Sequence, residues 1–205
     1  MRQSLVIIGN SAMGRETCAY AEDCGFFVKG FLDSRGALLD GYDNYPGTIS
    51  SVEDYSPCAG DAFVCALGDA VQRRHYVEII ESKGGRFVNV VHPAAYIGKN
   101  VTLGKGCIIC PNVTLSADIT VGDHVIVNIN SSISHDGIVG DFATISPGCH
   151  IAGWCHVGRG AFIGTGASLV PRVKLGDAGV FVAAGAVVTQ SFEMGRVMGV
   201  PAVLK

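Results

Sequence analysis

The sequence predicts two domains, a small α/β domain followed by a parallel β-helix. The β-helix is predicted by a six-residue repeat, in which every sixth residue from Ile97 to Leu175 is Ile, Leu or Val without a break. An α-helix needs apolar spacing near 3.6 and an alternating strand needs about 2, so neither produces this period. Stacked hexapeptides produce it, because each supplies one short strand and one corner, and three of them complete a coil. The α/β domain is predicted by strands that alternate with helical segments in residues 1–92.

The helices and strands of the first domain are predicted from apolar runs and from the glycines that end them. Helices are expected over about Arg15–Cys24 and Ala70–Lys83, where the apolar spacing is helical. Residues 34–60 are expected to form a loop-rich connection. We place the domain boundary between 1–92 and 93–205, where the repeat takes over. The expected strands are Ser4–Ile8, Phe26–Leu32, Ala62–Leu67 and Arg86–Val91.

Candidate ligand-binding residues gather at one edge of the predicted sheet, beyond the carboxyl ends of its strands. That edge holds the turn from Gly9 to Gly14, Asp33 and Gly68. A glycine turn that opens a helix offers N–H groups to phosphate, and an acid about twenty residues later accepts hydrogen bonds from a ribose or base. The turn lacks the middle glycine of GxGxxG and the Lys-Ser/Thr pair of a P-loop. A nucleotide site and an ordinary strand-to-helix turn therefore both remain open.

Composition excludes several classes of protein. With 48% hydrophobic and 16% charged residues, the 205-residue chain buries a core and is not disordered. A formal net charge of −3 without long charged runs argues against a nucleic-acid partner. The apolar run from Leu5 to Ile8 stops at Gly9, so neither a signal peptide nor a membrane span is expected. The 8 scattered cysteines suit a reducing compartment, and we expect a cytoplasmic protein.

Cysteine and histidine spacings favour structural roles over a metal site. Cys107 and Cys110 form a lone CxxC inside the repeat, where a buried cysteine acts as a small hydrophobe. His75 and His92 are assigned structural roles. Residues on one face of successive coils are eighteen apart in the sequence. The remaining histidines are His124, His135, His150 and His156, and no two of them have that separation. A zinc cluster like that of hexapeptide-repeat carbonic anhydrases is therefore not expected within one chain, although a subunit interface can still assemble one.

The strongest catalytic candidate is His135, which is followed directly by Asp136 at a corner of the repeat. Gly153 stands eighteen residues later, one coil further along. A glycine stacked beside a histidine leaves room for a substrate and exposes a backbone N–H. Acyl transfer needs these two functions, a base and an oxyanion donor. The other interpretation is an ordinary solvated corner pair.

A set of motifs spread over the chain resembles one enzyme family. The resemblance is to sugar acyltransferases of the sialic-acid O-acetyltransferase type. Within that group the chain is most similar to the nucleotide-activated amino-sugar N-acetyltransferases, such as the bacillosamine-pathway enzyme. The motifs are GNSAMGRE from Gly9, FLDS around Asp33, ALGD around Gly68, the Asn-Ser-Ser…His-Asp segment, Gly140-Asp141-Phe142, Ser146-Pro147-Gly148, Ala152-Gly153 and Gly199-Val200-Pro201-Ala202.

The resemblance implies a left-handed β-helix that assembles as a homotrimer, with acetyl-CoA in the groove between two subunits. It makes His135 the general base and Asp136 the residue that orients it, with no metal required. The N-terminal module is implied to hold the nucleotide-sugar through Gly9, Ser11, Ala12, Met13, Gly14, Asp33 and Gly68. The acetyl-CoA is implied to contact Thr144, Ala152, Gly153, Thr165, Ala183 and Ala184.

Two positions depart from the pattern of the bacillosamine-type enzymes. Those enzymes carry a histidine in the glycine turn where this chain has Met13, which weakens the expected diphosphate contact. They carry a second histidine nine residues after the base, where this chain has Thr144. The acetyl-CoA subsite is therefore expected to be built differently.

The predicted function is transfer of acetyl from acetyl-CoA to the amine of a nucleotide-linked 4-amino-deoxysugar. O-acetylation of a sialic acid or another capsular or lipopolysaccharide sugar is the nearest alternative, and no residue separates the two. Alternatives of another class are a hexapeptide-repeat metalloenzyme and an inactive binding scaffold. Arg159, Arg172 and Lys174 are candidates for the CoA phosphates or for ordinary solvated corner positions.

Overall fold

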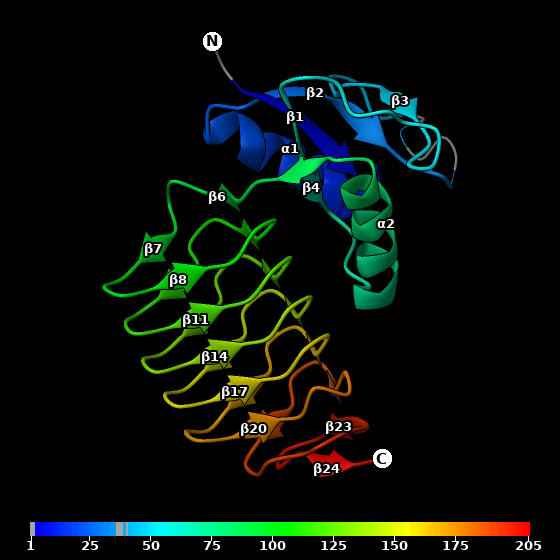
Figure 1. The fold of residues 1–205 in the computed structure, drawn as a ribbon. Coiled ribbons are helices and arrows are strands. Elements are labelled where there is room, and N and C mark those ends of the chain that lie inside the picture. The colour runs from blue at the N-terminus through cyan, green and yellow to red at the C-terminus, as the bar shows by residue number, and fades with distance from the viewer. Residues whose placement is uncertain (1–2, 36–38, 40) are drawn as a thin grey trace.

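The computed structural model of the protein describes residues 3–35, 39 and 41–205. An α/β domain sits at one end of a tall stack of coils, and helix α2 (Ala70–Ser82) runs alongside the first coils of that stack (Figure 1). The C-terminus lies at the far end of the stack. Both predicted parts are therefore present, first strands that alternate with helices and then a coiled repeat.

The N-terminal domain is a five-stranded sheet in the order β3-β2-β1-β4-β5. All neighbouring strands are parallel. Helix α1 (Ala12–Asp23) connects β1 to β2, and α2 connects β4 to β5. The central strands are almost fully buried, as expected for a parallel sheet that is covered on both faces. The strands are β1 (Ser4–Ile8), β2 (Phe27–Leu32), β3 (Thr48–Ser50), β4 (Asp61–Cys65) and β5 (Arg86–Phe87).

The predicted start of the first helix was wrong. Helix α1 begins at Ala12 rather than near Arg15, because Ser11 takes the extended conformation of an N-cap. Gly14 therefore lies inside the helix, where it packs against the carbonyl of Gly9. A Cβ on Gly14 would lie 2.0 Å from that oxygen, so close packing already explains this glycine.

Two further expectations needed correction. The connection over residues 34–60 contains the short strand β3, which pairs with β2 at the sheet edge. The predicted strand Arg86–Val91 divides in two, because β5 ends the N-terminal sheet and β6 (Val90–Val91) pairs with β9 of the β-helix. Between them, Asn89 accepts a hydrogen bond from the N–H of Cys107 at 2.9 Å and donates to the carbonyl of Gly104 at 2.8 Å. The chain thus passes directly from one sheet into the other.

The repeat forms a parallel β-helix with three faces, as the six-residue period predicts. Each repeated aliphatic residue from Ile97 to Leu175 is the second residue of a two-residue strand. Between Val90 and Leu175 strands on one face pair in parallel with a separation of eighteen, for example Leu115 with Ile133. The last coil is one residue longer, so that Phe162 pairs with Phe181. We call the three faces first, second and third, in the order in which the chain visits them from β7 onward.

The strand bounds of the three faces are as follows. The first face has β7 (Tyr96–Ile97), β10 (Thr114–Leu115), β13 (Ser132–Ile133), β16 (His150–Ile151), β19 (Ser168–Leu169) and β22 (Val187–Val188). The second face has β8 (Thr102–Leu103), β11 (Thr120–Val121), β14 (Ile138–Val139), β17 (His156–Val157) and β20 (Lys174–Leu175). The third face has β6, β9 (Ile108–Ile109), β12 (Ile126–Val127), β15 (Thr144–Ile145), β18 (Phe162–Ile163), β21 (Phe181–Val182), β23 (Arg196–Met198) and the antiparallel β24 (Val203–Leu204).

The corners of the β-helix use left-handed backbone conformations. Most of the non-glycine residues with positive φ are small polar residues, which tolerate it best: Asn100, Asn112, Asp118, Asn130 and Asp136 among them. Phe142, Trp154 and Arg172 take the same conformation although they are bulky, with φ of 58°, 58° and 70°. A bulky residue in this conformation is a true outlier and points to a role of its side chain.

None of the helices in the described residues is long and apolar enough to cross a membrane.

Candidate active site

His135 lies on the edge of the β-helix between the first and second faces, in the turn from β13 to β14. Its Nδ1 is 2.8 Å from Oδ2 of Asp136, and about half of each side chain is exposed. With Nδ1–H donated to the carboxylate, Nε2 is left free to accept a proton. We call this corner the His135 edge.

Gly153 occupies the next coil of the same edge and lies directly against the His135 ring. A Cβ at position 153 would stand 2.7 Å from Cε1 and Nε2 of the imidazole, so only glycine leaves the ring in place. The carbonyl of Gly153 accepts from the N–H of Arg172 at 3.0 Å. Its N–H donates to no acceptor among residues 3–35, 39 and 41–205. The edge thus joins a histidine, a carboxylate and an unused backbone donor.

Trp154 and Arg172 continue this edge, and sequence analysis missed the tryptophan. The indole meets the His135 imidazole edge to face, with centroids 4.5 Å apart and planes at 90°. The guanidinium carbon of Arg172 lies 4.5 Å above the indole on the next coil. A pocket of about 450 Å³ opens here, lined in part by Asp136, Trp154, His156 and Lys174. The sequence did contain a signal for Trp154: it is a bulky residue at a position where the preceding coils of the same edge carry Asn or Asp.

The N-terminal turn contacts Asp33 through Asn10, which lies between the predicted residues Gly9 and Ser11. The N–H of Asn10 donates to Asp33 Oδ2 at 3.0 Å, and Arg35 donates to the same carboxylate through its backbone and side chain. Burial raises the pKa of Asp33, but these hydrogen bonds outweigh it and leave the pKa below its ordinary value. The carboxylate therefore stays charged, and its nearest cation is the half-exposed Arg35.

The other predicted residues of this turn, Ser11, Ala12 and Met13, begin helix α1. Ser11 caps α1 without a side-chain hydrogen bond, so its hydroxyl is not used by the helix. Met13 is partly buried against the core, and its carbonyl accepts from the Thr17 hydroxyl at 2.7 Å. Ala12 and Met13 form the first turn of α1, where the backbone N–H groups have no acceptor within the helix itself.

Thr144 and Gly68, predicted for different ligands, are in direct contact. The Thr144 hydroxyl donates to the Gly68 carbonyl at 2.9 Å. Both line a pocket of about 590 Å³ between the start of α2 and the third face, where Phe162 and Phe181 stack 5.1 Å apart. We call it the α2 pocket. Neither His135 nor Gly153 lines it.

The remaining predicted acetyl-CoA residues lie on two different edges. Ala152 and Gly153 are on the His135 edge, whereas Thr165, Ala183 and Ala184 lie together on the edge between the third and first faces. There the Thr165 carbonyl accepts from the N–H of Gly185 at 2.8 Å. The three basic candidates also separate: Arg172 and Lys174 line the pocket beside Trp154, and Arg159 lies beside α2.

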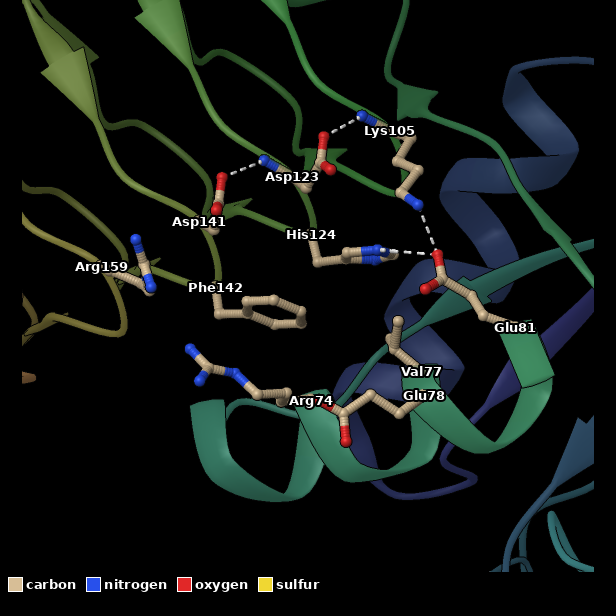
Figure 2. Close-up of a pocket in the computed structure, with 10 residues that line it drawn as sticks. All are labelled: Arg74, Val77, Glu78, Glu81, Lys105, Asp123, His124, Asp141, Phe142 and Arg159. Atoms are coloured by element: carbon tan, nitrogen blue, oxygen red, sulfur yellow. Dashed lines mark hydrogen bonds and ion pairs between the residues drawn. The ribbon is translucent and has the colours of Figure 1, made fainter.

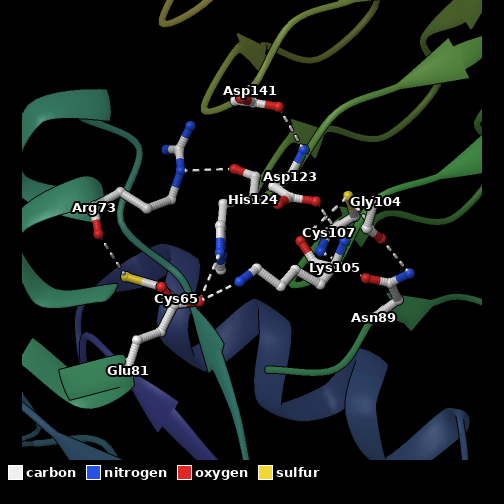
Figure 3. Close-up of polar contacts among 10 residues, drawn as sticks. All are labelled: Cys65, Arg73, Glu81, Asn89, Gly104, Lys105, Cys107, Asp123, His124 and Asp141. Carbon is white, nitrogen blue, oxygen red and sulfur yellow. Dashed lines mark hydrogen bonds and ion pairs between the residues drawn. The ribbon is translucent and has the colours of Figure 1, made fainter. Parts of the chain in front are cut away.

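Arg73 of α2 joins the two domains, and sequence analysis gave no indication of it. Its side chain is fully buried and its guanidinium donates to the carbonyls of His124, Phe142 and Ala143, and to the Thr144 hydroxyl (Figure 3 shows the His124 contact). It also donates to the carbonyls of Leu67 and Gly68. Burial lowers the pKa of Arg73 to about 10, so it remains charged near neutral pH. This one side chain holds the Gly68 turn against the β-helix.

His124 lies beside Arg73 on a pocket of about 250 Å³ that α2 forms with the β-helix (Figure 2). The ring stacks on Phe142 at 5.0 Å and meets Phe87 edge to face at 4.8 Å. Neither ring nitrogen has a hydrogen-bond partner within the described chain, and Glu81 approaches Nε2 only to 3.9 Å. Burial lowers the pKa of His124 to about 4, so the ring is neutral at pH 7.

The cysteines fit the structural interpretation. Cys107 and Cys110 are buried and unpaired, and burial raises their thiol pKa values to about 11 and about 12. Such thiols are poor nucleophiles and poor metal ligands near neutral pH. Over the part of the chain that the structure covers, His, Cys, Asp and Glu side chains form no group of three or more suited to a metal ion.

The chain is similar to known proteins in both of its domains. Residues 4–80 match the profile of the PglD N-terminal domain. The whole chain is similar to the acetyltransferase domain of PglB from Neisseria gonorrhoeae FA1090, with 27% identity, 100% of both chains covered and a TM-score of 0.90. A second structure of that domain is in complex with acetyl coenzyme A.

Two further solved structures match over nearly their full length. PerB from Caulobacter crescentus, in complex with CoA and GDP-perosamine, is 28% identical, covering 98% of this chain and 97% of that chain, with a TM-score of 0.90. WeeI from Acinetobacter baumannii AYE is 30% identical, covering 97% of this chain and 98% of that chain, with a TM-score of 0.86. These matches confirm the expected fold class, a Rossmann-like α/β domain followed by a left-handed parallel β-helix.

Proposed function

This chain belongs to the NeuD/PglD-like family of sugar acyltransferases and is an acetyl-CoA-dependent sugar acetyltransferase, and we propose that its acceptor is the 4-amino group of a nucleotide-linked amino-deoxysugar. The observation that carries the proposal is the His135 edge, where a histidine paired with a carboxylate faces a glycine with an unused N–H. The choice of an amine is supported by PerB, which is described as a perosamine N-acetyltransferase and is seen with GDP-perosamine.

In the proposed reaction, the amine nitrogen attacks the thioester carbonyl carbon and forms a tetrahedral intermediate. His135 Nε2 takes the proton that the attacking amine loses, while Asp136 holds the opposite ring nitrogen and fixes the tautomer. The Gly153 N–H donates to the developing oxyanion. Collapse of the intermediate breaks the carbon–sulfur bond, and the departing thiolate receives the proton from His135.

We assign the two substrates to different domains. Residues 1–92 hold the nucleotide-sugar through the turn from Gly9 to Gly14, Asp33 and Gly68, and residues 93–205 hold acetyl-CoA. Asp33 suits a nucleotide because its charged carboxylate can accept hydrogen bonds from a ribose or base, and the half-exposed Arg35 beside it at 2.7 Å is a cation of the kind that binds phosphate. Acetyl-CoA is assigned to the six β-helix positions named above, Thr144, Ala152, Gly153, Thr165, Ala183 and Ala184.

The separation of these residues supports an assembly of several copies. Within one chain Gly68 faces the α2 pocket, whereas His135 lies on an edge that does not line it. Thr144 and Thr165 likewise lie away from Gly153. A second copy that brings its His135 edge to the α2 pocket joins the base to the acceptor and gives the acetyl-CoA groove two walls. We therefore propose a homotrimer, with the active site shared between subunits.

The substrate proposal is tested by release of CoA thiol from acetyl-CoA. The acceptors are UDP-, GDP- and dTDP-linked 4-amino sugars and free sialic acid, each with product identification by mass spectrometry. We expect thiol release and an N-acetyl product with one of the nucleotide-linked amino sugars. Turnover of sialic acid alone would contradict the proposed acceptor while leaving the acetyltransferase activity in place.

The assembly is tested by sedimentation velocity. The chain has a mass of 21.3 kDa, and we expect a species of three times that mass. A stable monomer at assay concentration that retains full activity would exclude a shared active site. We place the reaction in the cytoplasm, where the eight free thiols remain reduced.

A further inference from the structure

The His135 edge carries a sequence irregularity that the β-helix itself does not require. Its corner positions, eighteen residues apart, are Asn100, Asp118, Asp136, Trp154 and Arg172, and all have positive φ. Asn and Asp suit this conformation, whereas a bulky side chain is disfavoured in it. The change from small to bulky occurs directly after the His135–Asp136 pair.

The bulky residues pack on the candidate base and on each other. The Trp154 indole contacts the His135 imidazole edge to face at 4.5 Å, and the Arg172 guanidinium covers the indole at 4.5 Å. The backbone holds this arrangement in register, because the N–H of Trp154 donates to the carbonyl of His135 at 3.0 Å. Imidazole, indole and guanidinium thus form a continuous row of contacts over three coils.

Asp136 alone does not fix the imidazole. Both members of the His135–Asp136 pair are about half exposed, and exposed ion pairs contribute little. The χ2 torsion of histidine is broad and roughly two-fold, so a single contact at Nδ1 leaves the ring freedom to turn about it. Gly153 supplies no side chain to stop that rotation. The indole of Trp154 is an aromatic group in contact with the ring, and it meets the imidazole edge to face.

We propose that Trp154 is a positioning residue for His135, which holds the imidazole against Gly153 with Nε2 facing the reacting groups. Arg172 backs the indole and keeps it in place. This inference rests on the proposed role of His135 as general base. It explains why the corner carries a conformationally disfavoured tryptophan: the side chain contributes to the reaction rather than to folding.

Kinetics separate this role from a structural one. Trp154→Asn installs the residue type that this corner conformation favours, so we expect an unchanged or higher Tm together with a kcat lowered by about tenfold. Trp154→Phe retains an aromatic face and is expected to restore most of kcat. The KM values for both substrates stay near wild type in both variants. The control is Asn100→Gly, at the first corner of the same edge and two coils away from Asp136, which keeps the wild-type kcat.

Three results for Trp154→Asn would overturn the inference. The first is a wild-type kcat, and the second is a change in KM alone. The third is an assembly that sedimentation shows to have dissociated, because the loss of activity would then have a structural cause. If His135→Ala also keeps full activity, the proposed function fails with it. If His135→Ala is inactive while Trp154→Asn is unaffected, only the positioning role fails.

Fluorescence tests the contact without any catalytic assay, because Trp154 is the only tryptophan in the chain. A protonated imidazole quenches an indole that it touches, so the emission of Trp154 is expected to fall when acidification protonates His135. The other titratable or charged groups that line the pocket beside the indole are Asp136, Cys155, His156, Arg172 and Lys174. His135→Gln should abolish the pH-dependent step, and His156→Gln should retain it. A step that follows His156 instead would contradict the contact.

Discussion

The backbone of Gly153 lies directly against the imidazole of His135, and a Cβ at position 153 would stand 2.7 Å from both Cε1 and Nε2 of that ring. The nearest atoms belong to the end of a half-exposed side chain, which can move. An added methyl group at this point therefore displaces the ring and leaves the fold intact.

Gly153→Ala is expected to lower kcat by about 100-fold, because a shift of roughly 1 Å in a reacting group has an effect of that size. Thermal denaturation should give a Tm close to wild type. The matched control is Gly47→Ala, since a Cβ on Gly47 meets nothing within 4 Å. Wild-type turnover in Gly153→Ala would show that the His135 ring is not where the reaction takes place.

His135→Ala should lower kcat by about 10²–10⁴ while folding, assembly and acetyl-CoA binding are retained. Asp136→Ala should have a smaller effect, because it only orients the ring. The residual activity of His135→Ala should rise in alkaline buffer, since an amine acceptor then supplies its own neutral form. A hydroxyl acceptor keeps its proton throughout that range and gives no such recovery. A pH–rate profile of this variant thus distinguishes N-acetylation from O-acetylation.

Asp33→Asn tests the assignment of the nucleotide-sugar to the N-terminal domain. An amide oxygen still accepts from the Asn10 N–H, but the charge that pairs with Arg35 is lost. Hydrogen bonds to charged groups contribute roughly 1.5–3 kcal/mol, so KM for the sugar nucleotide should rise by about tenfold to a hundredfold. Asp54→Asn, at a surface acid that accepts a hydrogen bond from the Ser51 hydroxyl, serves as control. A rise in KM for acetyl-CoA instead would reverse the division of substrates between the domains.

Arg73→Lys should destabilise the protein strongly. Lysine presents a point charge where the guanidinium fork donates to several acceptors at once, among them Gly68, His124 and Thr144. Leaving buried carbonyls without donors is expected to lower the free energy of unfolding by roughly 3–5 kcal/mol, measured by urea denaturation. Arg74→Lys is the control, because Arg74 lies over the Phe142 ring at 4.9 Å and binds no buried carbonyl in the described structure. Equal losses in the two variants would contradict the role assigned to Arg73.

His124 should make the protein less stable in acid. Burial holds its folded-state pKa near 4, well below the value of about 6.5 in an unfolded chain. Between these two values the unfolded chain binds more protons, so stability falls as pH decreases from about 6.5 to 4, by roughly 3 kcal/mol in total. Glu81, Asp123, Lys105 and Arg73 surround the ring and contribute to the same balance.

The measurement is unfolding free energy against pH in wild type and in His124→Asn, whose residue type tolerates the φ of 56° at this corner. The variant should be less stable at pH 7 but should lose less on acidification. His150→Asn, at a surface histidine bonded to Ser132, should keep the wild-type slope. A variant slope equal to wild type would assign the acid sensitivity to other groups.

The sequence by itself determined the β-helix and the composition of the His135 edge. A coil of three hexapeptides determines which residues stack, because strands within the unbroken repeat pair at a separation of eighteen. That is why the contact of Gly153 with His135 was predictable from numbering, and why Asp136 was correctly expected beside it. The alternation of strands and helices likewise fixed the parallel sheet that carries Asp33 and Gly68.

Only the tertiary structure decided how the two domains meet and what surrounds the base. Arg73 binds carbonyls more than fifty residues away, and no local pattern encodes where α2 docks on the β-helix. Thr144 was assigned to acetyl-CoA by position in a motif, yet its hydroxyl holds the Gly68 turn. Trp154 reads in the sequence as one more corner residue. Its role emerges from side-chain direction, because the corner backbone turns the indole onto His135, and a repeat period carries no information about that rotation.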